Sequence, residues 1–187
     1  MGKIILGVTI SLDGFAEDMN GSVNALYPDL GSLSDTEYMR DSIKNTGSVV
    51  MSKKEFEMAE DPDLYADHYE YQVPIFIFTD NMPSRNPKET DRISFTFVTK
   101  GIAEAVRLAK EAAGDKDVNI IGSALTTELC LKERLADELQ VDILPIFLGE
   151  GFRPFENMGK EDLRLERIEQ SALPEGRTHL VYRFSMF

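Results

Sequence analysis

Cysteine is almost absent from this chain. The single cysteine, Cys130, has no second thiol to pair with, so a disulfide within the chain is excluded, and this suits a reducing compartment. Leucines flank it on both sides, which favours a buried apolar thiol over a nucleophile. The fold must therefore depend on an apolar core, and 187 residues are enough to bury one.

Long apolar runs are absent as well. No stretch approaches the roughly 20 apolar residues that a membrane-spanning helix needs. The first residues enter a strand-like run without the apolar core and cleavage site of a signal peptide. We therefore expect a cytoplasmic protein that does not bind membranes, folded as a single domain over residues 1–187.

Positive charge is scarce. The chain has 20 lysines and arginines against 33 aspartates and glutamates, and its formal net charge is -13. Such a chain repels phosphate backbones, which disfavours nucleic acid as a partner. A phosphate-bearing cofactor would need a local cluster of donors. His68 and His179 lack cysteine, histidine or carboxylate partners at metal-ligand spacing, so no metal site is expected.

Apolar strand-like runs alternate with helical patterns along the chain. We predict strands over residues 3–10, 48–51, 74–78, 93–98, 118–121 and 139–148, with an irregularity at Pro145. Helices are predicted over residues 34–45, opened by a capping box at Ser34, and over 52–58, 101–113 and 124–134, whereas 21–33 and 81–91 are predicted loops. Residues 163–168 and 178–184 form a predicted antiparallel hairpin. This order predicts an α/β fold with a mainly parallel sheet covered by helices on both faces.

Polar sequence follows the second predicted strand. A helix that starts at Ser52 would offer unpaired amide donors, and Lys53 and Lys54 would add positive charge for a phosphate. Ser52 and Glu55 also match a capping box, in which the helix satisfies its own donors. Both interpretations, phosphate site and structural cap, stay open at this point.

Two further stretches follow predicted strands. Small residues at Gly122, Ser123 and Ala124 would let a ligand approach the backbone at a helix start, or would simply form a tight turn with Ser123 as the N-cap. Asp13, before Gly14, could orient a polar ligand or transfer a proton, or it could form an Asx-turn. Each pattern by itself is compatible with either role.

Taken together, these stretches resemble the dihydrofolate-reductase-like superfamily. The branch that contains the reductase domain of the bifunctional riboflavin-biosynthesis deaminase/reductase is the most similar. The resemblance covers nearly the whole chain and is carried by residues 11–14, 49–57, 120–123, 135–139, 145–151 and 154–155. The last groups are the most specific, because strand, proline and glycines recur in that order in this branch.

The resemblance implies a three-layer α/β/α sandwich, a homodimer, NADPH as hydride donor and a pterin-like or pyrimidine-like heterocycle as substrate. The cofactor contacts that it implies fall on Ser52, Lys53, Lys54, Thr79, Asp80, Gly122, Ser123 and Ala124. Asp13 is the candidate catalytic residue, in a loop over the site. No motif marks a proton donor, and the acids at positions 35, 37 and 41 are unranked candidates.

The sequence departs from the family pattern at both helix starts. The family has Gly-Arg-x-Thr where this chain has Ser52-Lys53-Lys54-Glu55, and paired glycines where it has Gly122-Ser123. Lysine keeps the charge of arginine but loses its bidentate fork. Two hypotheses follow: an NADPH-dependent reductase, or a non-catalytic binding protein of the same fold with a degenerate cofactor site.

Overall fold

A computed structural model of the chain describes residues 2–59, 61–156, 158 and 163–185. The chain divides into two compact units. Unit 1 contains Met1–Ile4 and Ile43–Ile121, and unit 2 contains Ile5–Ser42 and Gly122–Phe187. The single-domain organisation stays a prediction.

Unit 1 is built on four parallel strands. They are β2 (Thr46–Ser52), β3 (Ile75–Phe78), β4 (Phe95–Val98) and β5 (Asp117–Gly122), in the order β4-β3-β2-β5. Every residue of β3 is buried. Because successive side chains of a strand point to opposite faces, both faces of this strand are covered.

Three helices belong to unit 1: α3 (Lys53–Phe56), α4 (Leu64–His68) and α5 (Ile102–Ala113). The α5 helix packs on β2 and β3, and it buries one stripe of side chains at helical spacing: Ile102, Ala105, Val106, Ala109 and Ala113. It ends at Gly114, whose positive φ of 62° favours glycine. The helix predicted over residues 101–113 is confirmed.

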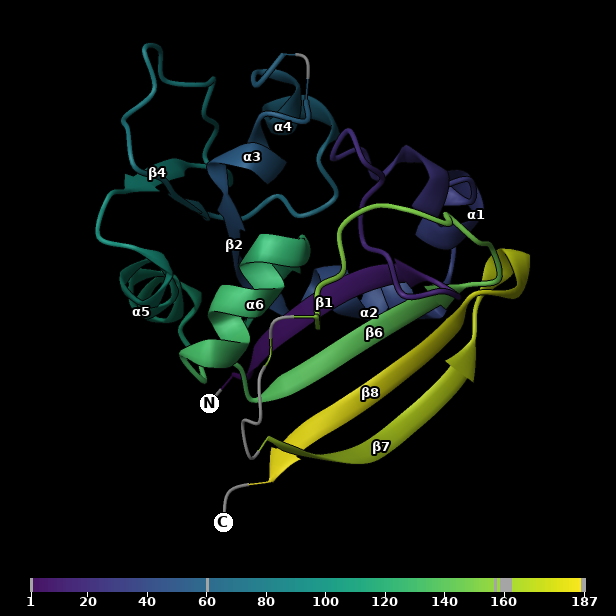
Figure 1. Cartoon of the computed structure of the whole chain (residues 1–187). Helices are drawn as coiled ribbons and strands as arrows, with labels where there is room; N and C mark the ends of the chain where they lie inside the picture. The colour runs from purple at the N-terminus through teal and green to yellow at the C-terminus, as the bar shows by residue number, and fades with distance from the viewer. Residues whose placement is uncertain (1, 60, 157, 159–162, 186–187) are drawn as a thin grey trace. The chain divides into compact units, whose positions relative to one another are not determined.

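Unit 2 combines parallel and antiparallel pairing. Its strands are β1 (Ile4–Ser11), β6 (Glu138–Leu144), β7 (Arg164–Ala172) and β8 (Thr178–Ser185), in the order β1-β6-β8-β7. The β1 and β6 strands run parallel, whereas β8 runs antiparallel to both β6 and β7 (Figure 1). The helical segments are η1 (Asn24–Leu26), α1 (Leu30–Ser34), α2 (Glu37–Asn45), α6 (Ala124–Lys132) and η2 (Pro174–Gly176). The predicted α/β class, with mostly parallel strands and an antiparallel C-terminal hairpin, is confirmed.

Four local predictions are wrong. The segment predicted as loop 21–33 contains η1 and the start of α1, and α4 was not predicted. Ser34 does not open the next helix, because its hydroxyl donates to the Leu30 carbonyl; instead the Thr36 hydroxyl accepts from Met39 N at 3.1 Å and caps α2. The β6 strand ends at Leu144, before Pro145, because proline cannot donate to the strand ladder.

The buried residues are mostly aliphatic, as a fold without disulfides requires. Cys130 lies among them, and burial raises the pKa of its thiol to about 12, which makes it unreactive at neutral pH. No helix in the part of the chain that the structure describes is long and apolar enough to cross a membrane.

Candidate functional site

The start of α3 closes on itself. The Ser52 hydroxyl accepts from Glu55 N at 3.4 Å, and the Glu55 carboxylate accepts a short hydrogen bond from Ser52 N. Both side chains are buried. The capping interpretation of Ser52 and Glu55 is confirmed, and these two donors are satisfied by the chain itself. The helix has only four residues, so its dipole contributes little.

The other predicted contacts in unit 1 lie at the same edge of the parallel strands. Ser52 pairs with Phe78 at the ends of β2 and β3, so the residues that follow each strand emerge side by side. Lys53 Nζ lies 3.5 Å from a Glu57 carboxylate oxygen. The Thr79 hydroxyl accepts from Asn81 N at 3.2 Å and donates to the Asn81 carbonyl at 2.9 Å.

Five predicted positions are therefore brought together in unit 1: Ser52, Lys53, Lys54, Thr79 and Asp80. The lysine side chains and the Asp80 carboxylate reach solvent. This edge carries the two lysines next to three carboxylates, those of Glu55, Glu57 and Asp80. The local charge is thus less positive than the Lys-Lys pair suggests.

The start of α6 lies in unit 2 and holds a carboxylate from elsewhere in the chain. Ser123 is the N-cap, and its hydroxyl accepts from Thr126 N at 3.3 Å. Ala124 N donates to a Glu17 carboxylate oxygen at 3.1 Å, and Glu17 is only 1% exposed. Sequence reasoning missed Glu17, because nothing in its local pattern indicates a partner 107 positions away.

Other atoms of the chain lie close to Gly122, where a side chain would not fit. A Cβ at this position would lie 2.6 Å from the Gly7 carbonyl oxygen and 2.7 Å from Thr127 Oγ1. The Thr127 hydroxyl is buried and has no hydrogen-bond partner among the residues that the structure describes. The close contact of Gly122 with Gly7 and Thr127 therefore explains the glycine without a ligand.

Asp13 clamps two loops of unit 2 together. Its carboxylate accepts from the Ser11 hydroxyl at 2.6 Å, from Leu148 N at 3.1 Å and from Gly149 N at 2.8 Å. The Ser11 hydrogen bond, followed by those from the two amides, lowers the pKa of Asp13 to about 2. A carboxylate this acidic is ionised at neutral pH, so the contacts support the loop-ordering role and make Asp13 a poor proton donor.

Acid should selectively weaken this clamp. Because the pKa of Asp13 is lowered in the folded state, its stabilisation is complete above the unfolded value of about 4 and is lost as the pH falls through about 2. We expect Asp13→Asn to lower the denaturation midpoint at neutral pH, and the gap to the parent chain to shrink between about pH 4 and pH 2. Urea denaturation of both proteins across this range measures the gap. A gap independent of pH would contradict the assignment of the charge.

The clamped loops are also paired through their backbones. Ala16 N donates to the Phe152 carbonyl and Phe152 N to the Glu17 carbonyl, each at 2.9 Å. Arg153 Nη1 donates to the Asp13 carbonyl at 2.6 Å. This pairing fixes the position from which the Glu17 side chain reaches α6.

A buried polar cluster, which sequence reasoning missed, lies on the same unit. Arg177 forms a bidentate pair with Asp29, with distances of 2.6 and 3.0 Å, and both side chains are fully buried. The Asp142 carboxylate accepts from His179 Nδ1 at 2.7 Å, and the centroids of the Tyr38 and His179 rings lie 4.4 Å apart. The acids at positions 35, 37 and 41, considered as proton donors, are exposed on or next to α2.

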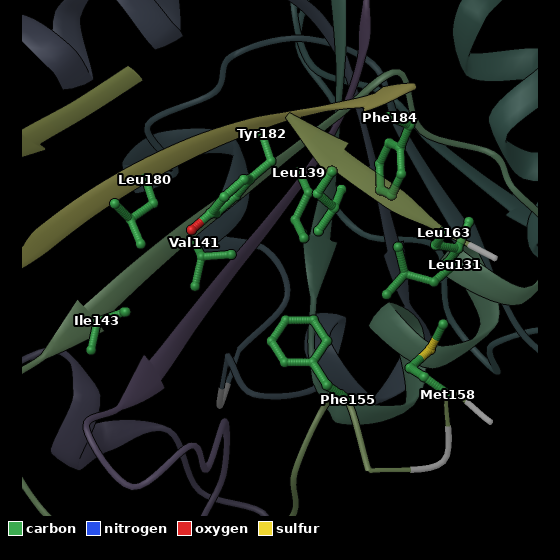
Figure 2. A pocket seen from close by; sticks show the side chains of 11 residues that line it. Leu131, Leu139, Val141, Ile143, Phe155, Met158, Leu163, Leu180, Tyr182 and Phe184 are labelled. Carbon is green, nitrogen blue, oxygen red and sulfur yellow. The ribbon is translucent and has the colours of Figure 1, made fainter. Parts of the chain in front are cut away.

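Unit 2 also holds an apolar pocket of about 410 Å³. Figure 2 shows Phe155 and Met158 facing side chains of β6 and β8, including Leu139, Val141 and Tyr182. Among the described residues, no charged side chain lines the pocket, so these residues offer no counter-charge for a phosphate. Among the described residues, no group of three or more histidines, cysteines or carboxylates could hold a metal ion.

Comparison with known proteins identifies relatives along the whole chain. The uncharacterized protein YyaP of Bacillus subtilis (strain 168) is 26% identical over 194 residues, which cover 98% of this chain and 95% of YyaP. A crystal structure from Shewanella sp. PV-4, of a protein named provisionally for riboflavin biosynthesis, matches with a TM-score of 0.76 and 21% identity over 98% of this chain and 99% of that one.

Dihydrofolate reductase from Enterococcus faecalis, solved with NADP(H), matches with a TM-score of 0.63 and 12% identity over 99% of this chain and 98% of that one. At these identities the solved structures show the fold, and they confirm that it is dihydrofolate-reductase-like. The sequence profile of the RibD C-terminal domain matches residues 2–177. Since that match spans almost the entire sequence, the chain belongs to the family of RibD C-terminal domains.

Proposed function

We propose that the protein is a reductase that transfers hydride from NADPH to a pterin-like or pyrimidine-like heterocycle. The observation that carries this proposal is the family match over residues 2–177. The cofactor would supply the hydride, and the chain would supply binding, orientation and electrostatics. Lys53 and Lys54 would bind phosphate, and the Asp13 clamp would order the loops of unit 2. The cytoplasmic location and the homodimer stay predictions.

A carboxylate of the chain already accepts from an amide at each helix start. Glu55 bonds to Ser52 N, and Glu17 bonds to Ala124 N. A phosphate cannot share these donors with a carboxylate, because two anions at such short range repel each other. A phosphate that uses the donor at either start therefore requires the carboxylate at that start to withdraw.

This requirement favours a second candidate, a non-catalytic binding protein of the same fold. Its specific support is the complete capping box at Ser52 and Glu55. On this view the helix start is closed permanently, and the chain binds a heterocycle or another partner without NADPH. The two candidates differ in one measurable property, the affinity for the cofactor.

Calorimetric titration with NADPH separates them. A reductase should bind NADPH saturably at or below millimolar concentration, whereas a closed site should show no binding. Glu55→Thr removes the carboxylate and restores the hydroxyl of the family pattern, so we expect it to tighten NADPH binding by about tenfold or more, equivalent to about 1.4 kcal/mol.

Glu57→Gln is the charge control, because it removes the same charge from the same short segment and releases Lys53 from its ion pair, but leaves the capping box intact. Tightening by Glu55→Thr that clearly exceeds that of Glu57→Gln would support a site blocked by capping. Equal affinities for the parent chain and Glu55→Thr would show that the cap does not limit binding, and absence of binding in every variant would remove the NADPH reductase proposal.

A further inference from the structure

Glu17 is a buried carboxylate placed where a ligand anion would be expected. Its side chain accepts from Ala124 N in the first turn of α6, a helix of nine residues. A helix start of this kind attracts anions through its free amides and its dipole. We propose that Glu17 is an internal anion that blocks this start, and that the start accepts a phosphate or pyrophosphate group only when the Glu17 carboxylate is neutralised or displaced. This inference rests on the proposed NADPH-dependent function, whose cofactor affinity it would control.

The backbone holds Glu17 in this position. Its carbonyl accepts from Phe152 N at 2.9 Å. Gly151 packs directly against it, since a Cβ there would lie 2.0 Å from the Glu17 carbonyl oxygen. The Asp13 clamp fixes the same pair of loops from the other end. The contact is therefore part of the folded loop structure and differs from an exposed acid that meets a helix by chance.

An unused donor lies at the same turn. Thr127 is fully buried, and its hydroxyl has no hydrogen-bond partner among the described residues. It lies 2.7 Å from the position that a Cβ would take at Gly122, in the turn that leads into α6. Buried hydroxyls are normally paired, so an unpaired one indicates a missing acceptor. A phosphate oxygen at the helix start would supply that acceptor.

The charge of Glu17, more than its bulk, should exclude the ligand. Glutamine has nearly the same shape, and its amide oxygen can still accept from Ala124 N, so Glu17→Gln should keep the loop and the helix start folded. The substitution removes the repulsion between two anions in a buried setting, where screening by solvent is weak. The expected gain in affinity for an anion is therefore tenfold or more.

Inorganic pyrophosphate is the direct probe. We expect it to bind Glu17→Gln at least tenfold more tightly than the parent chain in calorimetric titrations, and to shift the Ala124 amide signal in NMR spectra of that variant. Glu150→Gln is the matched control, because it removes one exposed carboxylate from the neighbouring loop and should change nothing. Adding Thr127→Val to Glu17→Gln deletes only the unpaired hydroxyl and should reverse part of the gain.

The outcomes separate this inference from the proposed function when NADPH is titrated in parallel. A tenfold gain for pyrophosphate without NADPH binding would support the block by Glu17 and remove the NADPH proposal. Equal NADPH binding by the parent chain and Glu17→Gln, with no gain for pyrophosphate, would overturn the block and leave the reductase proposal intact. If neither ligand binds either protein at millimolar concentration, both are overturned.

Discussion

Replacing Arg177 with methionine should lower the free energy of unfolding by about 3–5 kcal/mol, which is the usual cost of removing one partner from a buried ion pair. The Arg177 guanidinium binds both carboxylate oxygens of Asp29 and also donates to the Leu26 carbonyl at 3.0 Å. Methionine fills a similar volume but satisfies none of these acceptors. The substitution would leave the Asp29 charge buried and uncompensated.

Urea denaturation of Arg177→Met measures this loss. Arg167→Met is the matched control, because Arg167 is exposed on β7 and its replacement should change stability by no more than about 0.5 kcal/mol. Asp29→Asn tests the same pair from the other side and should also be strongly destabilising. A loss below about 1 kcal/mol for Arg177→Met would mean that the pair stabilises the fold no more than an ordinary surface salt bridge does. That result would contradict the large contribution expected of a buried pair.

The pair also predicts a pH dependence. Hydrogen bonds from Arg177 hold the pKa of Asp29 below its usual value. The stabilisation by Asp29 is therefore complete above about pH 4, the pKa expected in the unfolded chain, and it is lost as the pH falls through the lowered value in the folded chain. In Arg177→Met this acid-induced loss should be smaller, because the cause of the lowered pKa is gone.

The sequence predicts features that depend on neighbours in the chain. The reciprocal contact of Ser52 and Glu55 needs only three residues of separation, and the apolar stripe of α5 follows the helical repeat. The helix start at Ser34 was wrong because Thr36, two residues later, offers an equivalent hydroxyl. Local patterns could not decide between these two caps, and the structure settles the choice in favour of Thr36.

The features that sequence reasoning missed are long-range contacts between charged groups. Glu17 and Ala124 are 107 positions apart, and Asp29 and Arg177 are 148 apart. Each of these acids looks like a solvated surface residue in its local sequence, because buried charges are rare without a partner. Folding places the partner, so burial of such an acid can be recognised only once both segments are seen together.

The predicted cofactor residues illustrate the same limit. Sequence patterns correctly placed Ser52 and Ser123 at helix starts, where donors for an anion are expected. These patterns could not show that the Glu17 carboxylate already accepts from Ala124 N at the start of α6. Whether the positions in unit 1 and those in unit 2 share one cofactor stays a prediction, and the titrations of the Glu55 and Glu17 variants test each start separately.

Gly151→Ala should lower the free energy of unfolding by about 3 kcal/mol. Two effects add: overpacking against backbone costs about 1–3 kcal/mol, and a strained backbone conformation costs of the order of 1–3 kcal/mol. The new Cβ would lie 2.0 Å from the Glu17 carbonyl oxygen, and the φ of Gly151 is 143°, a value that residues with side chains rarely adopt.

Gly149→Ala separates the two effects. Gly149 also has a positive φ, 76°, but a Cβ there meets no atom within 4 Å. Its replacement should cost only the conformational term, about 1 kcal/mol. Chemical denaturation of both variants gives the difference, and hydrogen exchange at Ala124 N shows whether Glu17 has been pushed away from α6. Equal losses in the two variants, with unchanged protection at Ala124, would mean that Gly151 does not hold Glu17 in position, and the internal anion would then need another anchor.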